Sequence, residues 1–143
     1  MALRARRLMR DEEGAAIVEF ALVMPILALV VFGIIDFGRA FYTVNNIISA
    51  VREGARYGAV LADPGTESAE QSIEDRVRNV SRPFGGDSLT NDQIDVEFDE
   101  DAGTIKVRVD SYPFRPLTPI AGVLGFETWP ITREATFRWE RGI

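Results

Sequence analysis

The stretch "GAAIVEFALVMPILALVVFGII", residues 14–35, decides how this chain is organised, because it is almost entirely apolar. Residues 15–35 contain a single charged side chain, Glu19, and a single proline, Pro25. As a helix rising about 1.5 Å per residue, they extend about 31 Å, which matches the hydrocarbon core of a bilayer. We therefore expect residues 15–35 to span a membrane, with a charge near one end and a helix-straining proline inside.

The residues on the two sides of this segment differ in charge. Four arginines precede it: Arg4, Arg6, Arg7 and Arg10. Acidic residues dominate after it, in a chain whose net charge is −6. The positive-inside rule therefore predicts a cytoplasmic leader, residues 1–14, and a single-pass protein of the inner membrane whose body lies outside. A removable secretory signal is the alternative, although its apolar region would be shorter and residues 38–40 are only a weak cleavage candidate.

The composition excludes several classes of function. The 143 residues include no cysteine and no histidine. Disulfides, thiol nucleophiles, histidine bases and the usual Cys/His zinc sites are therefore excluded. The acidic balance argues against a nucleic-acid partner. Because no nucleophile–base pair or phosphate-binding loop is visible, the sequence predicts neither an enzyme nor a bound cofactor.

Beyond the apolar segment, residues 36–62 continue the helix with an amphipathic pattern. Apolar residues recur every three or four positions: Phe37, Phe41, Val44, Ile48, Val51 and Ala55. One long helix is therefore expected to run from about residue 15 to residue 62. Ala50, Gly54 and Gly58 place a small residue at every fourth position, which predicts a close-packing face. That face packs either on the protein's own sheet or on another subunit.

The remainder, residues 66–143, is predicted to be an α+β body. A second short helix is expected to begin with Ser68 as its N-cap and Gln71 completing a capping box. Alternating apolar residues predict strands at 94–98, 105–109 and 131–140, which form a small antiparallel sheet of about three strands. The acidic face of the first strand is expected opposite the basic face of the second. The proline-rich residues 112–130 are interpreted as a long loop that forms a contact surface.

The whole pattern resembles the type IV pilin architecture. Gly14, followed four residues later by Glu19 and Phe20, resembles a prepilin peptidase site, where glycine would allow an extended, uncrowded scissile bond. Residues 12–42 are similar to the TadE-like pseudopilins, or minor pilins, of the tight-adherence (Flp) pilus system. The family's Gly-Ile-x-Asp-x-Gly-Arg stretch is matched by the following residues: Gly33, Ile34, Asp36, Gly38 and Arg39.

This resemblance implies a role in the assembly, priming or tip of a pilus. Its partners would be a prepilin peptidase, other pilins and the inner-membrane platform, with the chain in the membrane or in an extracellular pilus. Cleavage after Gly14 would make Ala15 the first residue, and its new amine could pair with Glu19 and set the register between subunits. In an uncut chain, Glu19 would instead reach the headgroups. Pro25 is either a soft spot for leaving the bilayer or a mild kink.

A second interpretation stays open at this point. The chain could be an uncleaved, single-span envelope protein whose outer domain binds a partner. The two interpretations share the membrane segment and differ in whether residues 1–14 are removed.

Overall fold

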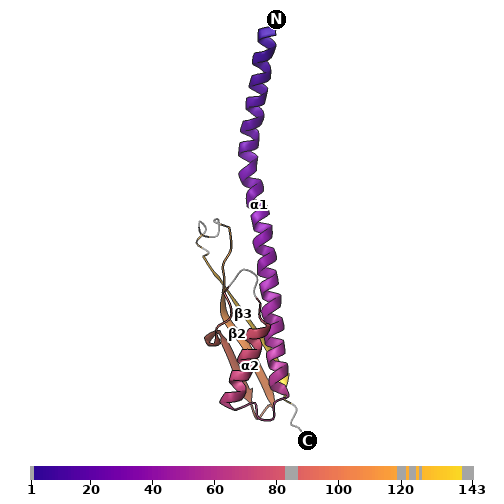
Figure 1. Cartoon of the computed structure of the whole chain (residues 1–143), viewed down its shortest axis with the longest axis vertical. Helices are drawn as coiled ribbons and strands as arrows, with labels where there is room; N and C mark the ends of the chain where they lie inside the picture. The colour runs from indigo at the N-terminus through magenta and orange to yellow at the C-terminus, as the bar shows by residue number, and fades with distance from the viewer. Residues whose placement is uncertain (1, 83–86, 119–121, 123–124, 126, 140–143) are drawn as a thin grey trace.

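A computed structural model describes residues 2–82, 87–118, 122, 125 and 127–139, with side chains from residue 14 onward. Figure 1 shows one very long helix whose C-terminal part lies against a small body, while its N-terminal part extends away from that body. The elements follow in this order: α1 (Ala2–Ala59), α2 (Glu67–Val80), the short 3-10 helix η1 (Asn91–Gln93), β1 (Ile94–Asp99), β2 (Thr104–Phe114) and β3 (Trp129–Arg138). The expected α+β fold is confirmed.

Helix α1 is continuous, and it begins inside the expected leader rather than at residue 15. The leader contains no proline, and its arginines, leucines and glutamates favour a helix. Pro25 lies inside α1 without ending it, although it cannot donate a hydrogen bond to the carbonyl of Ala21. The helix ends at Ala59, shortly before the expected boundary, and two tighter i to i−3 bonds follow, to the carbonyls of Tyr57 and Gly58.

Helix α2 confirms the expected second helix but corrects its N-cap. The cap is Thr66, whose Oγ1 accepts a hydrogen bond from the backbone N–H of Ala69 at 3.3 Å. Ser68 lies two residues later, inside the first turn of α2, and instead places its Oγ 3.3 Å from Thr66 Oγ1. Thr66 takes the role because it follows the turn at residues 63–65 with extended backbone angles, as a cap residue requires.

The sheet has the order β1-β2-β3, with both pairs antiparallel. The expected hairpin is confirmed, since β1 and β2 pair in register from Ile94 opposite Val109 to Asp99 opposite Thr104. Their outer faces carry opposite charges, and Lys106 forms an ion pair of 3.4 Å with Glu97. Such exposed pairs contribute little individually, but they are compatible with this register.

Strand β2 is longer than the alternation predicted, because it contains a bulge. The register shifts between Val109 and Tyr112, and Ser111 adopts a φ of 53°. The extra residue returns Tyr112 and Phe114 to the face that holds Val109, and all three are buried. The expected loop over residues 112–130 is therefore wrong at both ends, where its residues belong to β2 and β3.

The core lies between one face of the sheet and the two α-helices. Helix α1 packs against β2 and β3, and α2 packs against α1 and β1. The fully buried apolar residues come from α1, α2 and β2: Ile47, Ala50, Val51, Ala55, Ile73, Val77, Ile105, Val107 and Val109. The C-terminal part of α1 is thus part of the core, which fixes its position relative to the sheet.

Candidate assembly helix and helix–loop junction

The N-terminal half of α1 carries a continuous apolar surface. Large apolar side chains between Ile17 and Ile35 are exposed on every side of the helix. Within the described residues, the helical segment Gly14–Ala59 is the one long and apolar enough to cross a membrane. Leaving such a surface in water would be unfavourable by roughly 25 cal/mol for each Å² of apolar area. The segment therefore requires lipid or other helices around it.

The residues expected at the processing site all lie on this exposed half. Gly14, Ala15, Glu19 and Phe20 are exposed, and a Cβ at Gly14 would meet no atom within 4 Å. The backbone there is helical rather than extended, so a peptidase would have to unwind it before cleavage. Because Ala15 and Glu19 are four residues apart, they lie on the same face of the helix.

The expected close-packing face lies on the other half of α1, against the body. Ala50, Gly54 and Gly58 are buried. A Cβ added at Gly54 would lie 2.4 Å from Val77 Cγ2. A Cβ added at Gly58 would lie 2.4 Å from Ile105 Cδ1. These glycines allow α1 to approach α2 and β2 closely, and the protein's own body occupies this face.

Between the two halves lies a helix–loop junction, formed by Asp36 and Arg39 on α1 and residues 114–118 after β2. Both charged side chains are buried. The Asp36 carboxylate accepts four hydrogen bonds: from Arg39 Nη1 at 3.1 Å, Leu117 N at 2.8 Å, Thr118 N at 2.9 Å and Thr118 Oγ1 at 2.5 Å. A single carboxylate thus joins α1 to a segment more than seventy-five residues later.

Arg39 completes the junction from the other side. Its guanidinium carbon lies 5.4 Å from the centroid of the Phe114 ring, within the range of a cation–π interaction. Its Nη1 also donates a hydrogen bond to the carbonyl oxygen of Arg115 at 3.4 Å. The ion pair with Asp36 is therefore held between the helix and the end of β2.

The electrostatics of the junction favour an ionised Asp36. Burial opposes ionisation, but the hydrogen bonds from Thr118, Leu117 and Arg39 outweigh it, so the pKa of Asp36 is lowered from its ordinary value. Charge-assisted hydrogen bonds of this kind are stronger than neutral ones. The junction is consequently a firm attachment near neutral pH.

Sequence reasoning matched Asp36 and Arg39 to a family motif without giving them a role. A local signal was present, since two opposite charges three residues apart follow directly after a membrane-length apolar run. Their partners, Leu117 and Thr118, carry no comparable signal because they use backbone N–H groups and a hydroxyl. The junction could have been suspected from the sequence, but its second half could not.

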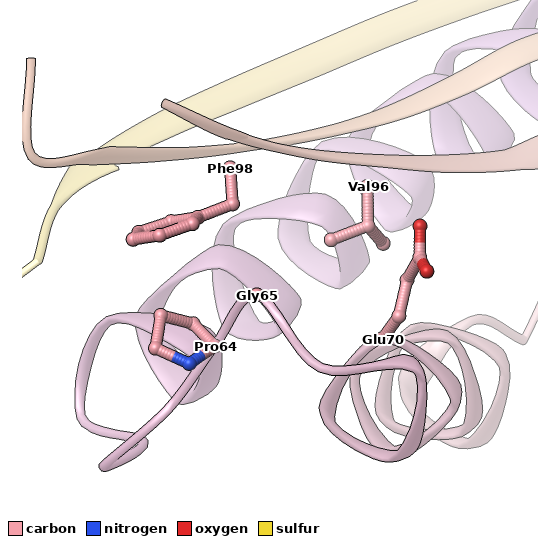
Figure 2. A pocket seen from close by; sticks show the side chains of 5 residues that line it. All are labelled: Pro64, Gly65, Glu70, Val96 and Phe98. Carbon is pink, nitrogen blue, oxygen red and sulfur yellow. The ribbon is translucent and has the colours of Figure 1, made fainter. Parts of the chain in front are cut away.

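A shallow pocket lies at the opposite end of the body. Figure 2 shows the residues that line it: Pro64, Gly65, Glu70, Val96 and Phe98. Its volume is about 250 Å³. Among these lining residues only Glu70 ionises, so they offer no pair of groups for acid–base chemistry.

Residues 14–56 match the family model of TadE-like proteins. The resemblance to TadE-like proteins is confirmed. No curated protein and no solved structure matches the chain.

The TadE-like match covers most of α1. It begins at Gly14 and ends before the C-terminus of α1, so it includes the exposed half, the charged pair of the junction and Gly54. The TadE-like family points to a role in tight-adherence pilus systems, and it is a family of structural rather than enzymatic proteins. An apolar N-terminal helix fits a membrane anchor in such a system.

Proposed function

We propose that this chain is a pseudopilin or minor pilin that takes part in the assembly, priming or tip formation of a tight-adherence pilus. The observation that carries the proposal is the TadE-like match, which begins at Gly14 and covers a helix half that is apolar and exposed all round. The chain is inserted in the inner membrane with residues 1–14 in the cytoplasm. Its α+β body lies outside.

Processing after Gly14 converts this anchor into an assembly surface. Removal of residues 1–14 gives Ala15 a free amine, which is largely cationic near neutral pH. Glu19 lies on the same helix face and can pair with that amine or with the amine of a neighbouring subunit. A buried charge pair of this kind fixes the axial register between helices better than apolar contacts do.

The position of Pro25 fits a step in which the apolar half of α1 leaves the bilayer during assembly. It lies within the exposed apolar half, where it leaves one backbone carbonyl without its helical partner. A helix with such a weak point can bend or locally unwind as it moves from lipid into a bundle of subunits. The partners in this step are the prepilin peptidase, other pilins and the membrane platform.

The test is a Glu19→Ala substitution in cells that build the pilus. The variant is expected to insert and to be cut, but pilus output should be lost because the register charge is missing. Glu67→Ala is the matched control, since Glu67 is an exposed carboxylate on α2, and its pilus output should be normal. Normal output from the Glu19 variant would contradict the proposed role of this residue.

One observation favours the second candidate, an uncleaved single-span envelope protein with a partner-binding body. Helix α1 runs without interruption through Gly14 and Ala15, which suits an intact chain. A full-length mature protein that captures no pilus component would favour this candidate.

A further inference from the structure

We propose that the segment following β2, centred on Leu117, docks on the outer surface of the same bilayer that α1 crosses. The body would then touch the membrane at a second point beside its own anchor. This inference rests on the proposed insertion of residues 15–35. It goes further, because it assigns a lipid-facing role to a part of the body that the TadE-like match does not reach.

The depth of Leu117 follows from the junction. Its backbone N–H donates a hydrogen bond of 2.8 Å to Asp36, and Asp36 follows residue 35 directly. If residue 35 lies at the edge of the hydrocarbon core, the backbone of Leu117 lies at the same level. Figure 1 shows the corresponding end of β2 and β3 beside α1, on the side of the body that faces the N-terminal half of the helix.

The side chains at this level suit a membrane interface. Leu117 is 66% exposed, Trp129 is 50% exposed and Phe37 is 76% exposed. Trp129 lies opposite Phe114 in the β2–β3 pair, and the Phe114 ring lies against Arg39. Arg39 is four residues beyond residue 35 along α1. Four residues of helix rise about 6 Å, and the headgroup layer is about 5–8 Å thick, so Trp129 lies at headgroup depth. Tryptophan and other aromatic residues concentrate at this depth in membrane proteins.

The polar groups of the segment are compatible with a poorly hydrated surface. The backbone N–H groups of Leu117 and Thr118 both donate to Asp36, as does the Thr118 hydroxyl. Approach to lipid therefore leaves none of these donors unsatisfied, which is the usual obstacle to placing irregular backbone near a bilayer. Isolated exposed apolar residues are ordinary in soluble domains. Here Leu117, Phe37 and Trp129 all lie between the levels of residues 35 and 39, at the end of a membrane-length apolar segment.

The experiment uses the full chain, which has no native cysteine, with single cysteines labelled by a fluorescent probe. Three positions are compared in phosphatidylethanolamine–phosphatidylglycerol vesicles with and without brominated acyl chains: Leu117→Cys, Leu27→Cys in the apolar segment, and Asp101→Cys in the exposed β1–β2 turn. Brominated lipid should quench the probes at Leu27 and Leu117 and leave the probe at Asp101 unquenched. Adding Asp36→Asn to the Leu117 variant should reduce its quenching towards the Asp101 value.

The outcomes separate this inference from the proposed function. Quenching at Leu27 with none at Leu117 would overturn the docking and leave the membrane anchor intact. Absence of quenching at both positions would overturn the anchor and the docking together. A Leu117 probe that loses contact with water only when other pilins are added would identify a neighbouring subunit as the occupant, which also overturns the docking.

Discussion

The two halves of α1 are both rich in apolar side chains, yet they are covered in opposite ways. Ile34 in the first half is 67% exposed, whereas Ile47 in the second half is 0% exposed. Glycines show the same contrast, because a Cβ at Gly33 would meet nothing within 4 Å and one at Gly54 would collide with Val77. The second half is stabilised by the protein's own body, and the first half requires lipid or other helices around it.

The two halves of this continuous helix therefore have different structural roles. The second half contributes buried side chains to the core of the body, while under the proposed function membrane insertion and assembly depend on the first half. The helix–loop junction at Asp36 and Arg39 marks the boundary, where the last body contacts meet the start of the exposed surface. Matched substitutions on the two sides should therefore affect different measurements.

The largest effect is expected from truncating isoleucine in the covered half. Ile47→Ala should lower the free energy of unfolding of the body by about 2–5 kcal/mol, because it removes a fully buried side chain and leaves a cavity. Ile34→Ala is the matched control and should leave that free energy unchanged. Both are measured by denaturant unfolding of the detergent-solubilised chain, followed by tryptophan fluorescence. Equal losses of unfolding free energy from Ile47→Ala and Ile34→Ala would contradict the proposed difference between the two halves of α1.

A smaller effect is expected at the boundary itself. Asp36→Asn should lower the free energy of unfolding by roughly 1–3 kcal/mol, because charge-assisted hydrogen bonds to Leu117 and Thr118 are lost. Thr118→Val removes one of the same bonds, so the double variant should lose less than the sum of the two single variants. Strict additivity would show that Asp36 and Thr118 do not interact as the structure indicates.

The smallest effect is expected from the glycines, where two opposing contributions partly cancel. Gly54→Ala overpacks the contact with α2 at a cost of about 1–3 kcal/mol, offset by about 1 kcal/mol of helix propensity, which leaves a net loss of about 1 kcal/mol. Gly38→Ala meets no neighbour and should be neutral or slightly stabilising. Thermal unfolding followed by circular dichroism compares the two. A Gly54 variant as stable as the Gly38 variant would mean that α2 is not in close contact with α1.

The sequence predicted those features that depend on local periodicity. The apolar segment, the first hairpin and the final strand follow from patterns that repeat within a few residues. The extension of β2 did not follow, because the bulge at Ser111 changes the alternation that identified the strand. The N-cap at Thr66 was missed because several capping residues stand close together and only the path of the chain selects one. Only half of the junction could be suspected from the sequence. Asp36 and Arg39 are opposite charges next to an apolar run, whereas their distant backbone partners have no sequence signal.

The proposed function depends most on whether residues 1–14 are removed by cleavage after Gly14. The direct measurement is the intact mass of the mature chain isolated from cells that build the pilus. Loss of residues 1–14, with Ala15 as the first residue, is the predicted result. A mature chain that retains residues 1–14 would contradict the proposed processing and favour a permanent single-span anchor.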